Sequence, residues 1–190
     1  MPTMTHRTIE LPAGFRSAEA ALVVASLDDQ TRLLFEDLEG ATPDELQYQP
    51  NLGMNTIGML LAHMAVVEAW WTLVIVEKAD PASVRPILGI NDDDDGMPIE
   101  AGAKPIALLN GKDLSFYRGL HAKARAYITK MVAGWTDSDL AAEVVRKRDD
   151  GTEVAISGRW YLYHVLEHFS GHYGQILLLR HLYKDAAARV

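Results

Sequence analysis

The sequence predicts an all-α protein, a four-helix bundle with a long crossover loop and a small β-hairpin before the last helix. Four long segments repeat apolar residues at steps of three and four, which is the period of an amphipathic helix. The connection between the second and third segments is unusually long, and a β-favouring stretch precedes the fourth. With 190 residues, the chain is most simply a single domain, residues 1–190.

The first predicted helices begin and end at recognisable signals. The first spans about residues 17–39 and stops at Gly40. The stretch "TPDELQY", residues 42–48, has the pattern of a capping box with proline at the first helical position, so we expect a short turn of helix there. The second long helix spans about residues 55–79, with Asn55 as its N-cap.

The remaining helices are separated by longer connections. Residues 80–112 contain four prolines and several glycines, and we expect them to cross the surface as a loop. A crossover of this length is what a bundle with a parallel pair of neighbouring helices requires. The third helix spans about residues 113–132 and the fourth about residues 158–184. Between them, β-favouring residues flank Asp150-Gly151, which predicts the hairpin.

Composition excludes several classes of function. The formal charge of -8, from 18 Lys and Arg against 26 Asp and Glu, repels phosphate backbones and anionic membranes, so we expect no nucleic-acid or membrane partner. The absence of cysteine excludes disulfides, thiolate ligands and a cysteine nucleophile. The N-terminal stretch lacks the continuous apolar core of a signal peptide, and no later run has the length of a spanning helix free of polar residues. We therefore expect a soluble cytoplasmic protein.

Three histidines follow one another at steps of four on the predicted last helix. Each step of four turns about 40° and rises about 6 Å, so His164, His168 and His172 form one stripe. Gln175 and Leu178 fall close to this stripe, which indicates an inward face. Adjacent histidines of the stripe could share a metal ion.

A fourth histidine, His63, points in an apolar direction on the predicted second helix. The residues within about 60° of it are Thr56, Met59, Leu60, Val67, Trp70 and Val74. Burying imidazoles without partners would cost about 1–3 kcal/mol each, and a metal ion would satisfy several at once. Spacing alone leaves two alternatives open, a metal site and a set of hydrogen-bonded core histidines.

Two segments resemble the signature segments of a known family. "NTIGMLLAHMAVVEAWW", residues 55–71, and "HVLEHFSGHYGQI", residues 164–176, are similar to those of the DinB/YfiT-like superfamily of metalloenzymes, which includes the bacillithiol- and mycothiol-dependent transferases. The resemblance covers most of the chain. It implies a four-helix bundle of up-down-down-up topology with a divalent metal bound by His63, His168 and His172. It also implies a homodimer.

His164 is not among the ligands that the resemblance implies. We expect it to support a ligand or line the pocket, and an ordinary buried histidine is the alternative. Gln175 is expected to orient a ligand or bind the water at the metal. The aromatic residues near these positions could line a substrate pocket or simply build the core; they are Trp70, Trp71, Trp160 and Tyr161.

Other motifs give weaker predictions. "HVLEH" matches the H-x-x-E-H of inverted zinc proteases, in which Glu167 would be the general base, but only Asp185 follows as an acidic ligand. The run "NDDDDGMPIE" fails as a calcium loop because Gly102 occupies the position of the bidentate glutamate. We expect a solvated loop there. Glu68 lies about 140° round the helix from His63 and is not expected to be a ligand.

The last helix is apolar on two faces. Opposite the histidine stripe lie Val165, Leu166, Phe169, Tyr173 and Leu177. We expect this face to be covered by the hairpin, the long loop or a second subunit, and a homodimer fits the last of these.

A site of three histidines leaves an open position on a divalent ion, where water or a thiol would lose its proton near neutral pH. We expect zinc or nickel, with iron or manganese as alternatives. Any reacting thiol must be a low-molecular-weight cosubstrate, because the chain has no cysteine. The predicted function is a metal-dependent thiol transferase or hydrolase acting on a small-molecule substrate. A non-catalytic, stress-associated metal-binding dimer and a purely structural bundle are the alternatives.

Overall fold

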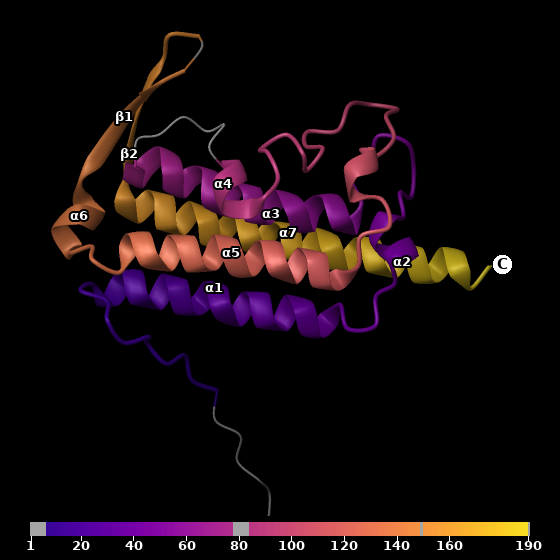
Figure 1. Ribbon diagram of the computed structural model, residues 1–190, viewed down its shortest axis with the longest axis horizontal. Helices are drawn as coiled ribbons and strands as arrows, with labels where there is room; N and C mark the ends of the chain where they lie inside the picture. Colours follow the sequence, from indigo (N-terminus) through magenta and orange to yellow (C-terminus); the bar gives the residue numbers. More distant parts are fainter. Residues whose placement is uncertain (1–6, 78–83, 149, 190) are drawn as a thin grey trace, which may run out of the picture.

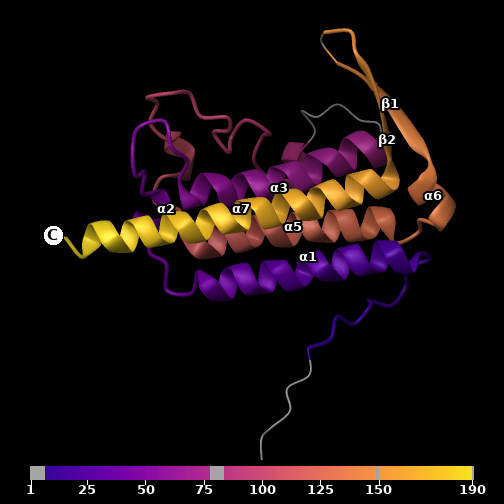
Figure 2. The same cartoon turned by 180° about the vertical axis from the view of Figure 1, so that it is seen from behind.

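The computed structural model describes residues 7–77, 84–148 and 150–189. This part of the chain is mostly helical, with a small two-stranded antiparallel sheet before the last helix. Four long helices lie side by side in both views (Figures 1 and 2). They are α1 (Ala18–Asp37), α3 (Ile57–Thr72), α5 (Leu114–Val132) and α7 (Gly158–Ala187). α3 packs against α5 and α7, and α1 packs against the same two helices.

The short helix α2 (Pro43–Gln47) forms where the capping pattern predicts it. Thr42 Oγ1 accepts a hydrogen bond from the Glu45 amide at 3.2 Å. The Glu45 carboxylate does not close the capping box, because it accepts a hydrogen bond from Arg180 Nε of α7 at 3.0 Å. The predicted box is therefore half formed, and its acidic residue links α2 to the last helix.

The predicted start of the second long helix was wrong by one residue. Thr56 is the N-cap of α3, and its hydroxyl accepts a hydrogen bond from the Met59 amide at 3.1 Å. After α3 the chain continues as the π-helix η1 (Leu73–Glu77), and the predicted end at Ala79 lies outside the described residues.

One segment, Ile57–Val76, is long and apolar enough to cross a membrane by length and composition. It is not free of polar residues, because it contains His63, Glu68 and Thr72. Of its most apolar window, 72% is buried inside the protein. Its apolar side chains are therefore used by the core, as expected of the central helix of a soluble protein.

Three short elements were not predicted, because each is too short to show a helical period. They are α4 (Arg85–Leu88), the 3-10 helix η3 (Ala107–Leu109) and α6 (Asp137–Ala141). The first two belong to the long segment between α3 and α5, which begins with η1 and consists mainly of turns and loops in its other described residues. α6 begins at a complete capping box formed by Thr136 and Asp139.

The predicted hairpin is present. β1 (Glu143–Lys147) and β2 (Glu153–Ser157) pair antiparallel, with Val145 opposite Ala155. At the turn, Gly151 has a φ of 84°, a conformation that glycine adopts without steric cost. Figure 1 shows the hairpin extending away from the helices beside the start of α7.

The deepest face of α7 is not the predicted one. Its most buried large side chains are those of Tyr161, Leu162, Val165, Phe169, Ile176 and Leu179. The expected inward face was therefore wrong in part: Gln175 is exposed, and Leu178 is 58% exposed. Since α7 is apolar on two sides, the pattern alone could not decide which side meets the other helices. Val165 and Phe169 lie in the core of this single chain and need no cover from a second subunit.

A network of charged groups, with Arg125 and Glu68 buried and Asp28 exposed, joins α1, α3 and α5. The Arg125 guanidinium donates to both carboxylate oxygens of Glu68, at 2.8 and 3.1 Å, and to Asp28 Oδ1 at 2.7 Å. Burial disfavours the charged form of Arg125, but the two carboxylates raise its pKa above the ordinary value. Nearby, His121 Nε2 donates to the Leu61 carbonyl at 3.0 Å. Burial, followed by the charge of Arg125, lowers the pKa of His121 to about 3.

Candidate metal centre

Three histidines from two helices converge at the boundary between α3 and α7. His168 Nε2 lies 3.2 Å from His63 Nε2 and 3.1 Å from His172 Nε2. One ring nitrogen from each residue lies within 4.8 Å of the other two. All three side chains are half-buried, so the cluster lies at the edge of the core and not at its centre. The residues that the resemblance implies as metal ligands are thus brought together.

The outer nitrogens of two of these rings are held by oxygen acceptors. His63 Nδ1 lies 2.8 Å from Asp95 Oδ2, and His172 Nδ1 lies 2.8 Å from Gln175 Oε1. Both oxygens are acceptors, so each Nδ1 carries the proton and each Nε2 keeps a free lone pair. The lone pairs of His63 and His172 are directed at His168. This second layer of hydrogen bonds is the arrangement that orients metal-binding histidines in proteins.

The convergent nitrogens cannot all satisfy one another. If His168 Nε2 carries a proton, it can donate to only one of its two neighbours. The other neighbour then faces a nitrogen without a shared proton. A divalent ion would accept all three lone pairs, and Zn²⁺ about 2.0–2.1 Å from each nitrogen at tetrahedral angles would separate the nitrogens by about 3.3 Å. The donor set and its spacing therefore fit a three-histidine metal site.

The rings of His168 and His172 are neutral at the pH where they would bind a cation. Burial, followed by repulsion from the neighbouring histidines, lowers the pKa of His168 to about 3. Burial also lowers the pKa of His172, although its hydrogen bond to Gln175 acts in the opposite direction. Protons therefore compete weakly with a metal ion for these two nitrogens near neutral pH.

Asp95 is the residue of this site that the sequence analysis missed. It belongs to the acidic run that we expected to be a solvated loop, yet it is 1% exposed. Its second oxygen accepts a hydrogen bond from the Met97 amide at 2.8 Å, which fixes the carboxylate toward His63. Nothing local distinguishes it from Asp92, Asp93 and Asp94, so only the path of the loop reveals its role.

His164 lies beside the cluster but does not join it. Its ring stacks on Trp160 with the centroids 4.8 Å apart, and it meets Trp71 edge-on at 5.3 Å. The ring of His168 is 5.9 Å away. His164 thus belongs to an aromatic wall next to the histidines, and its expected pocket-lining role stays a prediction. Of the other aromatic residues, Tyr161 is fully buried in the core.

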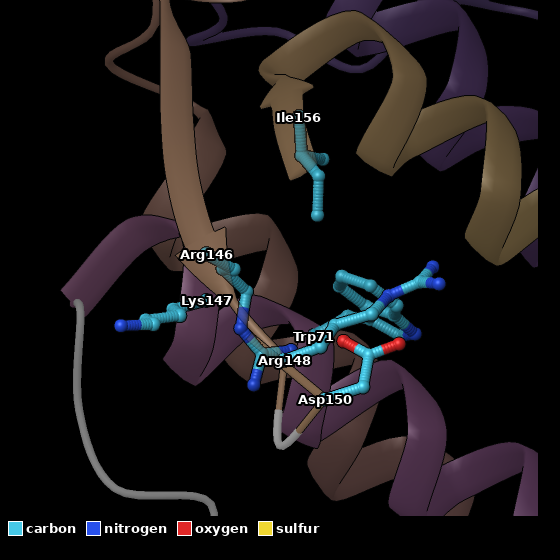
Figure 3. A pocket seen from close by; sticks show the side chains of 6 residues that line it. All are labelled: Trp71, Arg146, Lys147, Arg148, Asp150 and Ile156. Carbon is cyan, nitrogen blue, oxygen red and sulfur yellow. The ribbon is translucent and has the colours of Figure 1, made fainter. Parts of the chain in front are cut away.

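Two cavities lie on either side of the cluster along α3 and α7. The first, the hairpin cavity, has a volume of about 500 Å³ (Figure 3). Its lining residues are Trp71, Arg146, Lys147, Arg148, Asp150 and Ile156.

The second cavity, the apolar cavity, has a volume of about 360 Å³. Leu60, Met97, Ile99 and Leu178 contribute to its walls, and Gln175 lines it on the side of His172.

Glu68, which was not expected to be a ligand, and Glu167, the candidate general base of the protease motif, both lie outside the cluster. Glu68 is bonded to Arg125 in the buried network. Glu167 is exposed and lies 3.4 Å from His164 Nδ1, so it is not placed as the general base of a protease. Within the described residues, the acidic group that meets the histidine cluster is Asp95.

Comparisons with known proteins identify a family for this chain. The profile of the family described as Mycothiol-S-transferase matches residues 22–185, which include all three histidines of the cluster. A search of curated proteins gave no match. A solved structure described as the conserved protein of a locus from Enterococcus faecalis superposes with a TM-score of 0.61 at 14% sequence identity, covering 85% of this chain and 94% of that one. At this identity the likeness concerns the fold alone.

Proposed function

Because the chain belongs to the mycothiol-S-transferase family of DinB/YfiT-like proteins, we propose that it is a divalent-metal-dependent enzyme transferring a low-molecular-weight thiol to an electrophilic small molecule. The observation that carries the proposal is the convergence of three Nε2 atoms whose lone pairs need a shared cation. His63, His168 and His172 would hold the ion, with zinc or nickel as the favoured metals and iron or manganese as alternatives. A bound ion lowers the pKa of a thiol placed against it, which makes the thiolate available near neutral pH.

The protein groups around the ion have separate roles in this proposal. Asp95 and Gln175 fix the orientation of His63 and His172, so the lone pairs stay directed at one point. The rings of Trp71, Trp160 and His164 pack against one another and would shield one side of the site from water, with Trp71 edge-on to Trp160 and Trp160 stacked on His164. The chain contributes no cysteine of its own, so the thiol is a second substrate.

The two cavities favour thiol transfer over hydrolysis. Transfer needs room for two organic reactants, whereas hydrolysis needs room for one and a water. The hairpin cavity and the apolar cavity lie on opposite sides of the cluster and differ in chemistry, one lined by cations and the other mainly by apolar side chains. Hydrolysis of a small substrate is the second candidate, because the same ion would also activate water.

The broader assignments belong to the same proposal. We propose an up-down-down-up four-helix bundle, which is supported by the long connection between α3 and α5 and by the packing of α1 and α3 on the same two helices. We also propose a cytoplasmic homodimer that acts on small molecules and binds neither nucleic acid nor membrane. The net charge of -8 supports the proposal that the protein binds neither nucleic acid nor membrane.

Metal content measured by mass spectrometry tests the proposal first. The protein is purified without an affinity tag and compared with the double variant His168→Ala, His172→Ala. His181→Ala is the matched control, because His181 is exposed on the same helix and outside the cluster. We expect one equivalent of metal in the parent and in the control, and none in the double variant. A parent that stays empty after incubation with zinc, nickel and manganese contradicts the metal site.

Turnover then separates the candidate functions. The metal-loaded protein is incubated with thiols and a model electrophile, and separately with small esters and amides. Consumption of thiol that disappears in the double variant supports the transferase. Ester or amide cleavage without thiol consumption supports the hydrolase, and a loaded but inactive protein supports the non-catalytic metal-binding alternative.

A further inference from the structure

The hairpin cavity carries positive charge that the proposed metal chemistry does not use. Arg146, Lys147 and Arg148 follow one another at the end of β1, in a chain whose formal charge is -8. Among the described residues, none of these three cations has a carboxylate oxygen within 4 Å. Charge of this kind, left without an internal partner beside a cavity, is available to a ligand.

Arg146, Lys147 and Arg148 all line the cavity, but the two arginine side chains lie on a different side of the strand from the lysine side chain. Side chains alternate along a strand, so Arg146 and Arg148 share a side that Lys147 does not. Figure 3 shows Lys147 extending away from Trp71, while both arginines lie on the side of Trp71. The Arg146 guanidinium lies over the rings of Trp70 and Trp71, with Cζ 4.8 and 5.9 Å from their centroids. This contact holds the guanidinium in place without neutralising it.

One carboxylate also lines the cavity. Asp150 accepts a hydrogen bond from the Thr152 amide at 2.8 Å, and this bond lowers the pKa of Asp150. The Asp150 carboxylate therefore stays charged, and the hydrogen bond from the Thr152 amide holds it in the turn. Two guanidinium groups against one carboxylate leave an excess of positive charge, which suits a ligand with one or two negative charges.

The cavity is aligned with the histidine cluster. Trp71 forms its wall, the His164 ring lies 5.3 Å from that of Trp71, and the His168 ring follows at 5.9 Å. A volume of about 500 Å³ is in the range of small-molecule sites. A reactant with its charged end between the arginines would extend along the aromatic wall toward the convergent nitrogens.

We propose that the hairpin cavity binds the anionic group, a carboxylate or phosphate, of one of the two reactants, and that Arg146 and Arg148 recognise it. That the bound molecule is a reactant rests on the proposed function. The binding itself does not depend on turnover. Arginine suits this task because its planar fork donates two parallel hydrogen bonds to such a group.

Fluorescence of the cavity tryptophan tests the proposal. Succinate and inorganic phosphate are titrated at low ionic strength into the full chain, with succinamide as the neutral counterpart of succinate. Binding is followed in both the metal-loaded and the metal-free protein, because an anion held only by the metal would bind only the loaded form. We expect both forms to bind an anion and neither to bind succinamide, and the tighter anion identifies the preferred group.

Three variants of one strand sharpen the test. Arg146→Gln and Arg148→Gln should each weaken anion binding roughly tenfold, the effect of losing one charged hydrogen-bonding partner. Lys147→Gln removes the same charge from the neighbouring position and should change the affinity less than twofold by the same scale. Circular dichroism and the melting temperature check that each variant is folded, and Arg148→Gln is the milder change because Arg148 is exposed and lies outside β1.

The outcomes separate this inference from the proposed function. Anion binding that needs Arg146 and Arg148 supports the cavity assignment even if no thiol is turned over, and in that case the transferase proposal fails alone. Equal weakening by Lys147→Gln, or no binding in the metal-free parent, overturns the assignment whether or not the protein is an active transferase.

Discussion

Two groups of ionisable side chains extend from α3 in different directions, and they differ in how their hydrogen-bonding groups are paired. Toward α5 and α1, Glu68 meets Arg125, whose donors are shared among carboxylates and a hydroxyl within the protein. Toward α7, His63 meets two further histidines whose inner nitrogens face one another. In the first group, Nε, Nη1 and Nη2 of the Arg125 guanidinium each have an acceptor within the chain. In the second, the inner nitrogens cannot all share protons with one another, and this difference distinguishes the structural network from the proposed metal site.

Breaking the internal network should cost the most stability. Arg125→Met leaves Glu68 charged and buried without its partner, and we expect a loss of about 3–5 kcal/mol in the free energy of unfolding. Urea denaturation of the metal-free protein measures it. The control is Arg32→Met, which removes an exposed ion pair on α1 and should change stability little. A small loss in Arg125→Met would mean that Glu68 takes up a proton or reaches water.

Disturbing the support of the histidine cluster should weaken metal binding and leave the fold intact. In Asp95→Asn, one carboxylate oxygen is replaced by an NH2 group, which donates hydrogen bonds. The side chain can then no longer accept hydrogen bonds from both His63 Nδ1 and the Met97 amide. We expect metal affinity to fall about 10–100-fold, as measured by competition with a chromophoric chelator. Asp94→Asn removes the same charge one residue earlier, where the carboxylate caps the Asn91 amide, and should keep the parent affinity. Equal effects in both variants would point to long-range charge and not to orientation of His63.

The buried histidine of the internal network should give the metal-free protein a pH-dependent stability. The pKa of His121 is about 3 in the folded protein, against about 6.5 when unfolded. Between these values the unfolded state binds the extra proton, so stability falls as the pH falls, by about 1.4 kcal/mol per pH unit for this one group.

His121→Gln keeps a donor for the Leu61 carbonyl but does not titrate. Urea unfolding from pH 6.5 to 4.5 should show a smaller slope in the variant than in the parent. His168 adds a similar dependence in the metal-free form, so the slope should shrink and not vanish. An unchanged slope would show that His121 is protonated in the folded protein.

The smallest effect is expected at the exposed acid of the "HVLEH" motif. Glu167→Gln should leave metal content, thiol turnover and stability at the parent level, because the side chain is 56% exposed and its ion-pair partner among the described residues is His164. Parallel assays of turnover and metal content measure this. Loss of activity at full metal content would restore a catalytic role for Glu167.

Much of this arrangement could be predicted from the sequence, for reasons that differ between residues. His168 and His172 are one turn apart on one helix, so local spacing already brings their rings together. His63 was predicted as a ligand from the resemblance of its segment to a family signature. Asp95 could not be found, because a loop has no period and four consecutive aspartates look alike until the chain path turns one of them inward. The deeper face of α7 was also ambiguous, since packing and not pattern decides between two apolar sides.

Asp95 also connects the long segment between α3 and α5 to the helix that carries His63, while His168 and His172 connect α7 to the same point. An ion at that point would be a cross-link between parts of the chain far apart in the sequence. It would bind the folded chain and not the unfolded one, so mass action would add about 4 kcal/mol of stability at a free ion concentration a thousand times the Kd. The melting temperature of the protein would then rise and fall with the metal supply around it.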